Sequence, residues 1–269
     1  MGIPGRDGVA RPPRGWSRRE FLQATAGSVV ASVLAGCVRG ATAPDPGDPR
    51  LSARPAAPTH TPTIGVATPL GLGGTRDGLL YVPNGYVGDT PVPLFVALHG
   101  AGGAGAMWES YYARADQRGM VLLAPDSRGS TWDFAATGTF DADVAFLDQA
   151  LRYTFERCRV DPGRIALAGF SDGASYTLCL GPSNGDLFSH LVAYSPGFMT
   201  AVAPIVGKPR IYVSHGTADT VLPVATTRDH IVPTLRNAGY DVTYDEFDGG
   251  HQVPAAVSEA ALDWFLAAG

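Results

Sequence analysis

The chain has 269 residues, of which 45% are hydrophobic, with 34 glycines, 22 prolines and a formal net charge of −5. This length suffices for one hydrophobic core of about 200 residues with appendages. The acidic balance and the lack of a basic patch argue against nucleic acid as a partner.

The first 37 residues have the composition of an export signal. Residues 16–23, WSRREFLQ, resemble the twin-arginine export signal of bacteria. Thirteen uncharged residues follow at 24–36, a length that suits a signal-peptide core but is short for a membrane span. The segment ends in Leu-Ala-Gly-Cys37, which resembles a lipoprotein lipobox. That resemblance implies that Cys37 is lipidated and anchors an exported protein at the outer face of a bacterial membrane in the cell envelope; an ordinary secretory signal is the alternative.

Residues 38–62 are rich in proline, alanine and small polar residues. Because they contain few large apolar side chains, the sequence predicts a semi-extended tether that does not pack. We therefore expect a signal at 1–37, a tether at 38–62 and one folded domain at 63–269.

From residue 63 onward, apolar runs alternate with helical patterns. The patterns predict strands at 63–71, 78–84, 92–100, 120–126, 164–169, 190–196, 209–216 and 241–249. They predict helices at 105–119, 141–158, from 172, at 226–240 with an interruption at proline, and at 253–269. This alternation indicates an α/β fold with a mostly parallel, doubly wound sheet of about eight strands. In such sheets ligands bind at the carboxyl ends of the strands, so chemistry is expected directly after strands.

A serine flanked by glycines follows the strand at 164–169 and opens a helix, in the order Gly169-Phe170-Ser171-Asp172-Gly173. Glycines on both sides permit a turn so sharp that the serine is presented at the top of the sheet. The helix that follows directs backbone N–H groups toward the same point. This pattern favours Ser171 as a nucleophile over a simple packing turn.

A serine hydroxyl needs a base, and the base needs an orienting acid. In the chain order serine, acid, histidine, the base should come last. His251 follows the last strand in a Gly-Gly loop and fits that place, whereas His215 precedes the acid and is expected to be structural. Asp219, just past a strand end, is the predicted acid, with Asp248 as the second choice.

Acyl transfer also needs donors for an oxyanion. The backbone N–H of Asp172 directly follows the nucleophile, and the glycine-rich loop after the strand at 92–100 supplies the N–H of Ala101. Since only the backbone of Asp172 is required there, its carboxylate is expected to cap or occupy the first turn of the helix, or to repel acidic substrates.

Together the stretches LHGAGG, RIALAGFSDGASY, VSHGTADTVLPV and GGHQVP resemble the α/β-hydrolase superfamily. Within it they are similar to small phospholipase/carboxylesterase-like serine esterases, near dienelactone hydrolases and polyhydroxybutyrate-depolymerase-like esterases. The resemblance implies a catalytic domain with Ser171, Asp219 and His251 as triad, Ala101 and Asp172 as oxyanion donors, and neither a metal nor a cofactor. It implies a small-molecule or lipid-like ester as substrate. We see no insertion long enough to form a large lid.

Three aromatic side chains are candidates for the substrate pocket: Trp108 after the oxyanion loop, Trp132 in the loop at 127–140, and Phe198 after a strand. For Trp132, a surface loop with a buried tryptophan is the alternative. Cys158 and Cys179 lie on helices that flank one strand. In an exported domain they could form a disulfide, and two buried free thiols are the alternative.

The sequence leaves three functions open. An exported serine carboxylester hydrolase is favoured, because every triad residue is present. A catalytically silent envelope lipoprotein that binds a ligand is a second function. A serine peptidase or acyltransferase with the same triad is a third, since the leaving group and the acceptor depend on pocket shape.

Overall fold

The computed structural model describes residues 45–267. The predicted signal at 1–37, including Cys37, and the first part of the predicted tether lie outside the described residues. In the described part no helix is long and apolar enough to cross a membrane.

The centre of the fold is an eight-stranded sheet, which confirms the predicted architecture. Its strands lie in the order β1-β2-β4-β3-β5-β6-β7-β8, and all neighbours from β4 to β8 are parallel, while β1 and β2 form an antiparallel edge. The strands are β1 (Thr68–Pro69), β2 (Gly78–Tyr81), β3 (Val92–Leu98), β4 (Val121–Pro125), β5 (Val160–Phe170), β6 (His190–Tyr194), β7 (Arg210–Gly216) and β8 (Val242–Phe247).

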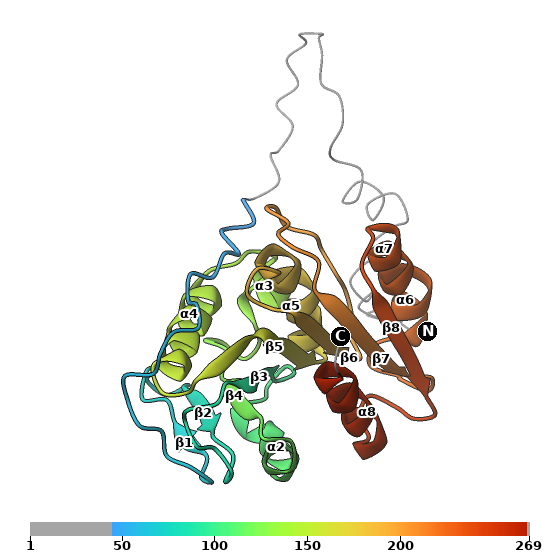
Figure 1. Ribbon diagram of the computed structural model, residues 1–269. Coiled ribbons are helices and arrows are strands. Elements are labelled where there is room, and N and C mark those ends of the chain that lie inside the picture. The colour runs from blue at the N-terminus through green and yellow to red at the C-terminus, as the bar shows by residue number, and fades with distance from the viewer. Residues whose placement is uncertain (1–44, 268–269) are drawn as a thin grey trace, which may run out of the picture. The chain divides into compact units, whose positions relative to one another are not determined.

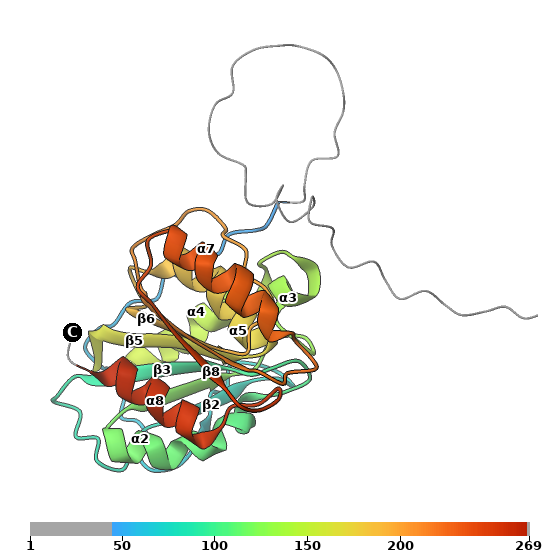
Figure 2. The same ribbon diagram turned by 90° about the vertical axis from the view of Figure 1, so that its right-hand side faces the viewer.

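Helices cover both faces of the sheet. Figure 2 shows α2 (Tyr112–Arg118) and α8 (Ala255–Leu266) on one face and α4 (Ala142–Phe155), α5 (Asp172–Leu180) and α7 (Val232–Asn237) on the other. Shorter helical segments complete the connections: η1 (Gly105–Tyr111), α3 (Asp133–Thr137), η2 (Gly181–Asn184), α6 (Val224–Thr226) and η3 (Thr227–Ile231). The predicted interruption by proline is the passage from η3 to α7, with Pro233 in the first turn of α7.

The core has two layers because alternate residues of each central strand face opposite sides. On β3, Leu94, Val96 and Leu98 pack toward the α4 and α5 side, whereas Phe95 and Ala97 pack toward α2 and α8. All five side chains are fully buried. A strand that is covered on both faces therefore needs a continuous apolar run. Burial of these runs holds the strands in place, and with them the polar residues that follow the strand ends.

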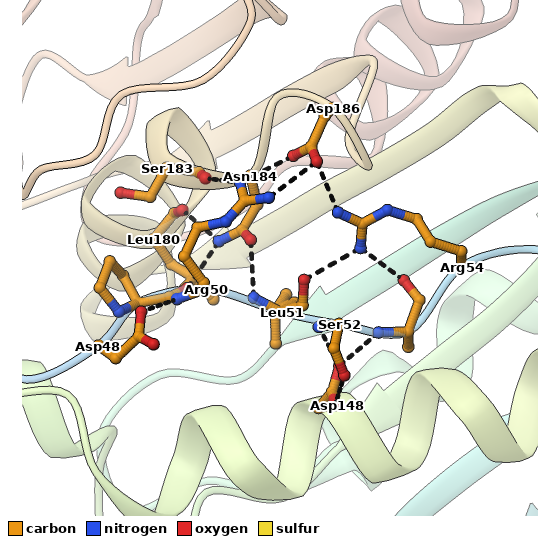
Figure 3. Close-up of polar contacts among 12 residues, drawn as sticks. Asp48, Arg50, Leu51, Ser52, Arg54, Asp148, Leu180, Ser183, Asn184 and Asp186 are labelled. Carbon is orange, nitrogen blue, oxygen red and sulfur yellow. Dashed lines mark hydrogen bonds and ion pairs between the residues drawn. The ribbon is translucent and has the colours of Figure 1, made fainter.

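Residues 45–60, which we call the strap, correct the prediction of a non-packing tether. The strap is extended, as predicted, but it lies along α4 and η2 (Figures 1 and 3), and Leu51 and Ala53 are buried. Its N-terminal end meets the loop before α4, where the Phe140 N–H donates to Pro46 O at 2.7 Å. Two apolar side chains and backbone hydrogen bonds are enough to hold the strap. The prediction was wrong on this point because it relied on the small number of large apolar side chains.

Side chains of η2 and α4 bind the backbone of the strap (Figure 3). The buried Asn184 accepts the Leu51 N–H at 2.9 Å and donates to Pro49 O at 2.8 Å. Asp148 on α4 accepts the N–H groups of Ser52 and Ala53, both at 2.7 Å. The strap is therefore part of the folded domain, whose described portion begins before residue 63.

Candidate active site

Ser171 occupies the sharp turn between β5 and α5. Its backbone has φ 56° and ψ −120°, in the left-handed half of the map that few non-glycine residues adopt. A Cβ at Gly169 would lie 2.2 Å from Gly173 O, and one at Gly173 would lie 2.5 Å from Leu98 O. Both glycines are therefore required by close backbone approach, which is the physical reason for the spacing found in the sequence.

The structure brings Ser171, His251 and Asp219 into one hydrogen-bonded chain. His251 Nε2 lies 2.8 Å from Ser171 Oγ, and His251 Nδ1 lies 2.6 Å from Asp219 Oδ2. Because a carboxylate only accepts, Nδ1 carries the proton, and the Nε2 lone pair is free to accept the serine proton. The histidine bonds to Asp219 and not to Asp248, the second choice. The ring of Phe170 packs against the imidazole at 4.7 Å between centroids.

Asp219 is held in its ionised form. Burial would raise the pKa of its carboxyl, but hydrogen bonds from the backbone N–H of Leu222, from His251 and from the N–H of Val221 outweigh burial and hold that pKa below its usual value. The carboxylate is therefore available to orient the imidazole and to stabilise an imidazolium.

A second histidine stands behind Asp219. His215, at the end of β7, is fully buried, and its Nε2 lies 3.2 Å from Asp219 Oδ2 and 2.8 Å from Leu222 O. Since a carbonyl only accepts, this nitrogen carries a proton and donates it. Its Nδ1 contacts Thr227 Oγ1 at 2.8 Å. The structural role expected for His215 thus includes fixing the turn that presents the acid.

The predicted oxyanion loop lies against the nucleophile. A Cβ at Gly100 would be only 3.2 Å from Ser171 Cβ, so the backbone approaches the serine as closely as a glycine allows. Ala101 follows it and is exposed, and Asp172 is the first residue of α5. This arrangement has the parts of an oxyanion hole, namely a backbone loop and a helix start on either side of the serine.

A buried polar network fixes the oxyanion loop. His99 Nδ1 donates to Gly100 O at 2.7 Å, and its Nε2 accepts from the Ser127 N–H at 2.9 Å and from Arg76 Nη2 at 3.2 Å. Burial lowers the pKa of His99, which keeps the ring neutral and able to accept. Arg76 also donates to Gly103 O at 2.7 Å. Sequence reasoning missed Arg76, because it lies on the loop before β2 and no motif marks it.

The carboxylate of Asp172 does not cap the helix. It lies in the first turn, as one of the alternatives expected, but α5 has no side-chain cap, and Asp172 accepts a hydrogen bond from Thr131 Oγ1 at 2.7 Å. The bond joins the turn after β5 to the loop at 127–132, so the side chain connects two loops of the site.

The three aromatic pocket candidates have different positions. Trp108 lines a cavity of about 390 Å³ beside His251. Trp132 is fully buried and donates from Nε1 to His99 O at 2.8 Å, so it supports the oxyanion loop from below and is no pocket wall. Phe198 packs against the core and does not line that cavity. The prediction is therefore corrected for the fully buried Trp132, whereas Phe198, which is half-buried, stays a prediction.

Cys158 and Cys179 are both free and buried, so they do not form the disulfide that was considered. Burial raises the pKa of Cys158 to about 12 and that of Cys179 to about 12, which leaves both thiols protonated and unreactive. Within residues 45–267, no group of three His, Cys, Asp or Glu side chains is arranged to hold a metal ion.

Sequence comparison relates this chain to esterases over part of its length, although no family model matches it. A feruloyl esterase B from Thermothelomyces thermophilus is 30% identical over 125 residues, which is 43% of this chain and 42% of that protein. An acetylxylan esterase from Coprinopsis cinerea is 30% identical over 35% of this chain and 28% of that protein. A poly(3-hydroxybutyrate) depolymerase from Ralstonia pickettii is 34% identical over 38% of this chain and 22% of that protein. The chain spans less than half the length of each of these relatives.

Solved structures match over most of the chain. An acetyl xylan esterase from Aspergillus awamori has a TM-score of 0.57 and 18% identity, covering 71% of this chain and 94% of that one. The esterase PE8 has a TM-score of 0.55 and 22% identity, covering 70% of this chain and 96% of that one. With the sheet order and the flanking helices, these matches show that the chain has the α/β-hydrolase fold.

Proposed function

We propose that this protein is an exported serine hydrolase that cleaves carboxylic esters through an acyl-enzyme on Ser171. The observation that carries the proposal is the hydrogen-bonded chain from Ser171 Oγ through His251 to Asp219 at the carboxyl ends of the strands. The relatives named as feruloyl esterase, acetylxylan esterase and poly(3-hydroxybutyrate) depolymerase support an ester as substrate.

The reaction follows from the positions of the groups. Ser171 Oγ attacks the ester carbonyl as its proton passes to His251 Nε2, and the carbonyl oxygen becomes an oxyanion beside the N–H groups of Ala101 and Asp172. The C–O bond to the alcohol then breaks, and the imidazolium gives its proton to the leaving oxygen. Water, deprotonated by the same imidazole, releases the acid and restores the serine. Asp219 keeps the imidazole oriented in both halves of the reaction.

Labelling with a fluorophosphonate, followed by peptide mapping, tests this proposal. We expect label on Ser171 alone in the purified protein and none in Ser171→Ala, together with loss of p-nitrophenyl acetate turnover. A folded protein that takes no label would overturn the proposal and favour the catalytically silent binding protein. Label on Ser171 with cleavage of peptides but not esters would favour the peptidase.

We also propose that the protein is exported by the twin-arginine route and anchored by a lipid on Cys37. This rests on the sequence motifs alone, since those residues lie outside the described part. In a bacterial host, the protein should fractionate with membranes and Cys37→Ser should be soluble. Replacement of Arg18 and Arg19 by lysine should retain the protein in the cytoplasm, and unchanged export would overturn the twin-arginine assignment.

A further inference from the structure

We propose that the cavity beside His251 holds the alcohol part of the ester and that Arg114 within it selects alcohols carrying a carboxylate or another anionic group. The inference deepens the proposed function and rests on it, because only an ester-cleaving enzyme has an alcohol to hold. It concerns residues that the triad and the oxyanion loop do not include.

The position of the cavity assigns it to the alcohol side. In ester cleavage the leaving oxygen takes its proton from His251 Nε2, so this oxygen must lie beside the imidazole. The cavity of about 390 Å³ is lined by His251, by Phe170 beneath the imidazole, and by Gln252 and Val253 directly after it. Its volume lies within the range of small-molecule sites. A group attached to the leaving oxygen is therefore placed at the mouth of this cavity.

The walls of the cavity favour a compact apolar group. Trp108 and Tyr111 stand edge to face at 4.9 Å between ring centroids, and both line the cavity. Met107 lines it as well and is 45% exposed, which places an adaptable apolar side chain at the surface. Flat aromatic walls and a flexible thioether suit a planar or short branched alcohol better than an extended sugar chain.

Arg114 is the one cationic side chain among the residues that line this cavity. Its Nε bonds to Glu259 at 2.6 Å and its Nη1 to Ser110 O at 2.6 Å, which fixes the guanidinium and leaves Nη2 without a partner among the described residues. The side chain is 16% exposed, whereas its partner Glu259 is 41% exposed and does not line the cavity. A fixed, largely desolvated guanidinium with a nitrogen to spare is suited to bind a carboxylate.

The start of α8 adds to the positive potential of the same cavity. Ala255, its first residue, and Ser258, in its first turn, both line the cavity, and the helix has no side-chain cap. The unpaired N–H groups of a twelve-residue helix carry a partial positive charge that complements an anion. The helix start thus supports the selection attributed to Arg114.

Two near-isosteric esters whose alcohols differ in charge test the inference: the anionic 4-acetoxybenzoate and the neutral 4-acetoxybenzamide. Both give the same acetyl-enzyme, so its hydrolysis is common to them and they differ only in the alcohol that leaves. We expect kcat/KM for the benzoate to exceed that for the benzamide about five- to tenfold in the wild-type protein, the gain from one charge-assisted hydrogen bond. In Arg114→Gln the ratio should fall about five- to tenfold from its wild-type value, and Arg114→Lys should keep part of it.

Arg118→Gln is the matched control. Arg118 bonds to the same Glu259, at 2.5 Å, but does not line the cavity, so this variant should keep the wild-type ratio. A wild-type ratio of one or less, or an unchanged ratio in Arg114→Gln, would overturn the inference while turnover of the benzamide upholds the proposed function. If neither ester is cleaved in a Ser171-dependent manner, the proposed function itself fails.

Discussion

The turn that carries Ser171 and the strap at residues 45–60 are both irregular segments, held in opposite ways. At the turn, backbone shape positions a side chain, because a Cβ at Gly169 or at Gly173 would lie only 2.2 or 2.5 Å from a neighbouring backbone oxygen. At the strap, side chains of the body position a backbone, as Asn184 does for Pro49 and Leu51. The first device is local in sequence, and the second joins residues more than 130 positions apart. The shape of the serine turn thus depends on a few adjacent residues, whereas the position of the strap depends on distant ones.

The largest effect is expected at the acid of the triad. Asp219→Asn should lower kcat for p-nitrophenyl acetate about 10⁴-fold, because an amide favours the wrong tautomer of the imidazole. Steady-state kinetics would measure it, with thermal melting to verify folding. Asp248→Asn is the matched control, since Asp248 is near His251 in sequence but makes no hydrogen bond with it, and its kcat should stay within twofold. Equal losses in the two variants would contradict the assignment of the acid.

A smaller effect is expected from an arginine that acts through the oxyanion loop. Arg76→Gln should lower kcat about 10²-fold with little change in KM, because the loop loses the bonds to His99 and Gly103 that fix its N–H donors. Arg76 is a positioning residue, so the split between kcat and KM distinguishes this role from a general loss of stability.

The strap provides the control for that experiment. Arg54→Gln removes a more exposed arginine from the strap, where it bonds to Asp186 at 2.6 Å. This variant should keep the wild-type kcat. If Arg76→Gln and Arg54→Gln lower kcat by the same factor and the melting temperature by the same amount, the oxyanion loop does not depend on Arg76 in particular.

The contrast between the serine turn and the strap also explains which residues of the site could be predicted from the sequence. Ser171, Asp219 and His251 could be assigned because each follows a strand and because the glycine spacing has a steric cause that the sequence displays. Trp132 could not be separated from a pocket residue, since its burial and its bond to His99 O depend on the packing of α3 and the loop before it. Arg76 acts through His99 and Gly103, which only the folded chain brings close to it.

The sheet itself was predictable for a related reason. Continuous apolar runs such as 92–98 indicate strands buried on both faces, whatever covers them. The strap was not predictable in this way, because a single Leu51 provides its main apolar contact and several other contacts are hydrogen bonds to its backbone. Because almost every residue type has a backbone N–H, a hydrogen bond from the backbone cannot be recognised in the sequence.

Asn184 is expected to matter for stability and not for catalysis. Asn184→Ala should lower the free energy of unfolding by about 2 kcal/mol, because it leaves the Leu51 N–H and Pro49 O buried without partners. Chemical denaturation would measure the loss, and kcat at 25 °C should be unchanged. The exposed Asn237→Ala is the control and should change the free energy by less than about 0.5 kcal/mol. Loss of kcat without loss of stability would show that the strap reaches the active site.

The smallest effect concerns pH and the ion pairs of the strap. A hydrogen bond from Arg50 is the main cause that holds the pKa of Asp186 well below its usual value. Partial burial opposes this effect, and a hydrogen bond from Arg54 adds to it. A carboxyl whose pKa is lowered by folding stabilises the fold above its unfolded pKa of about 3.9, and this contribution disappears as pH falls below that value. Because the pairs are about one-third exposed, the contribution is at most about 1 kcal/mol. Denaturation of the wild type and of Asp186→Asn should therefore differ at pH 7 and converge toward pH 2, and a constant difference across this range would mean that Asp186 holds the strap by shape and not by charge.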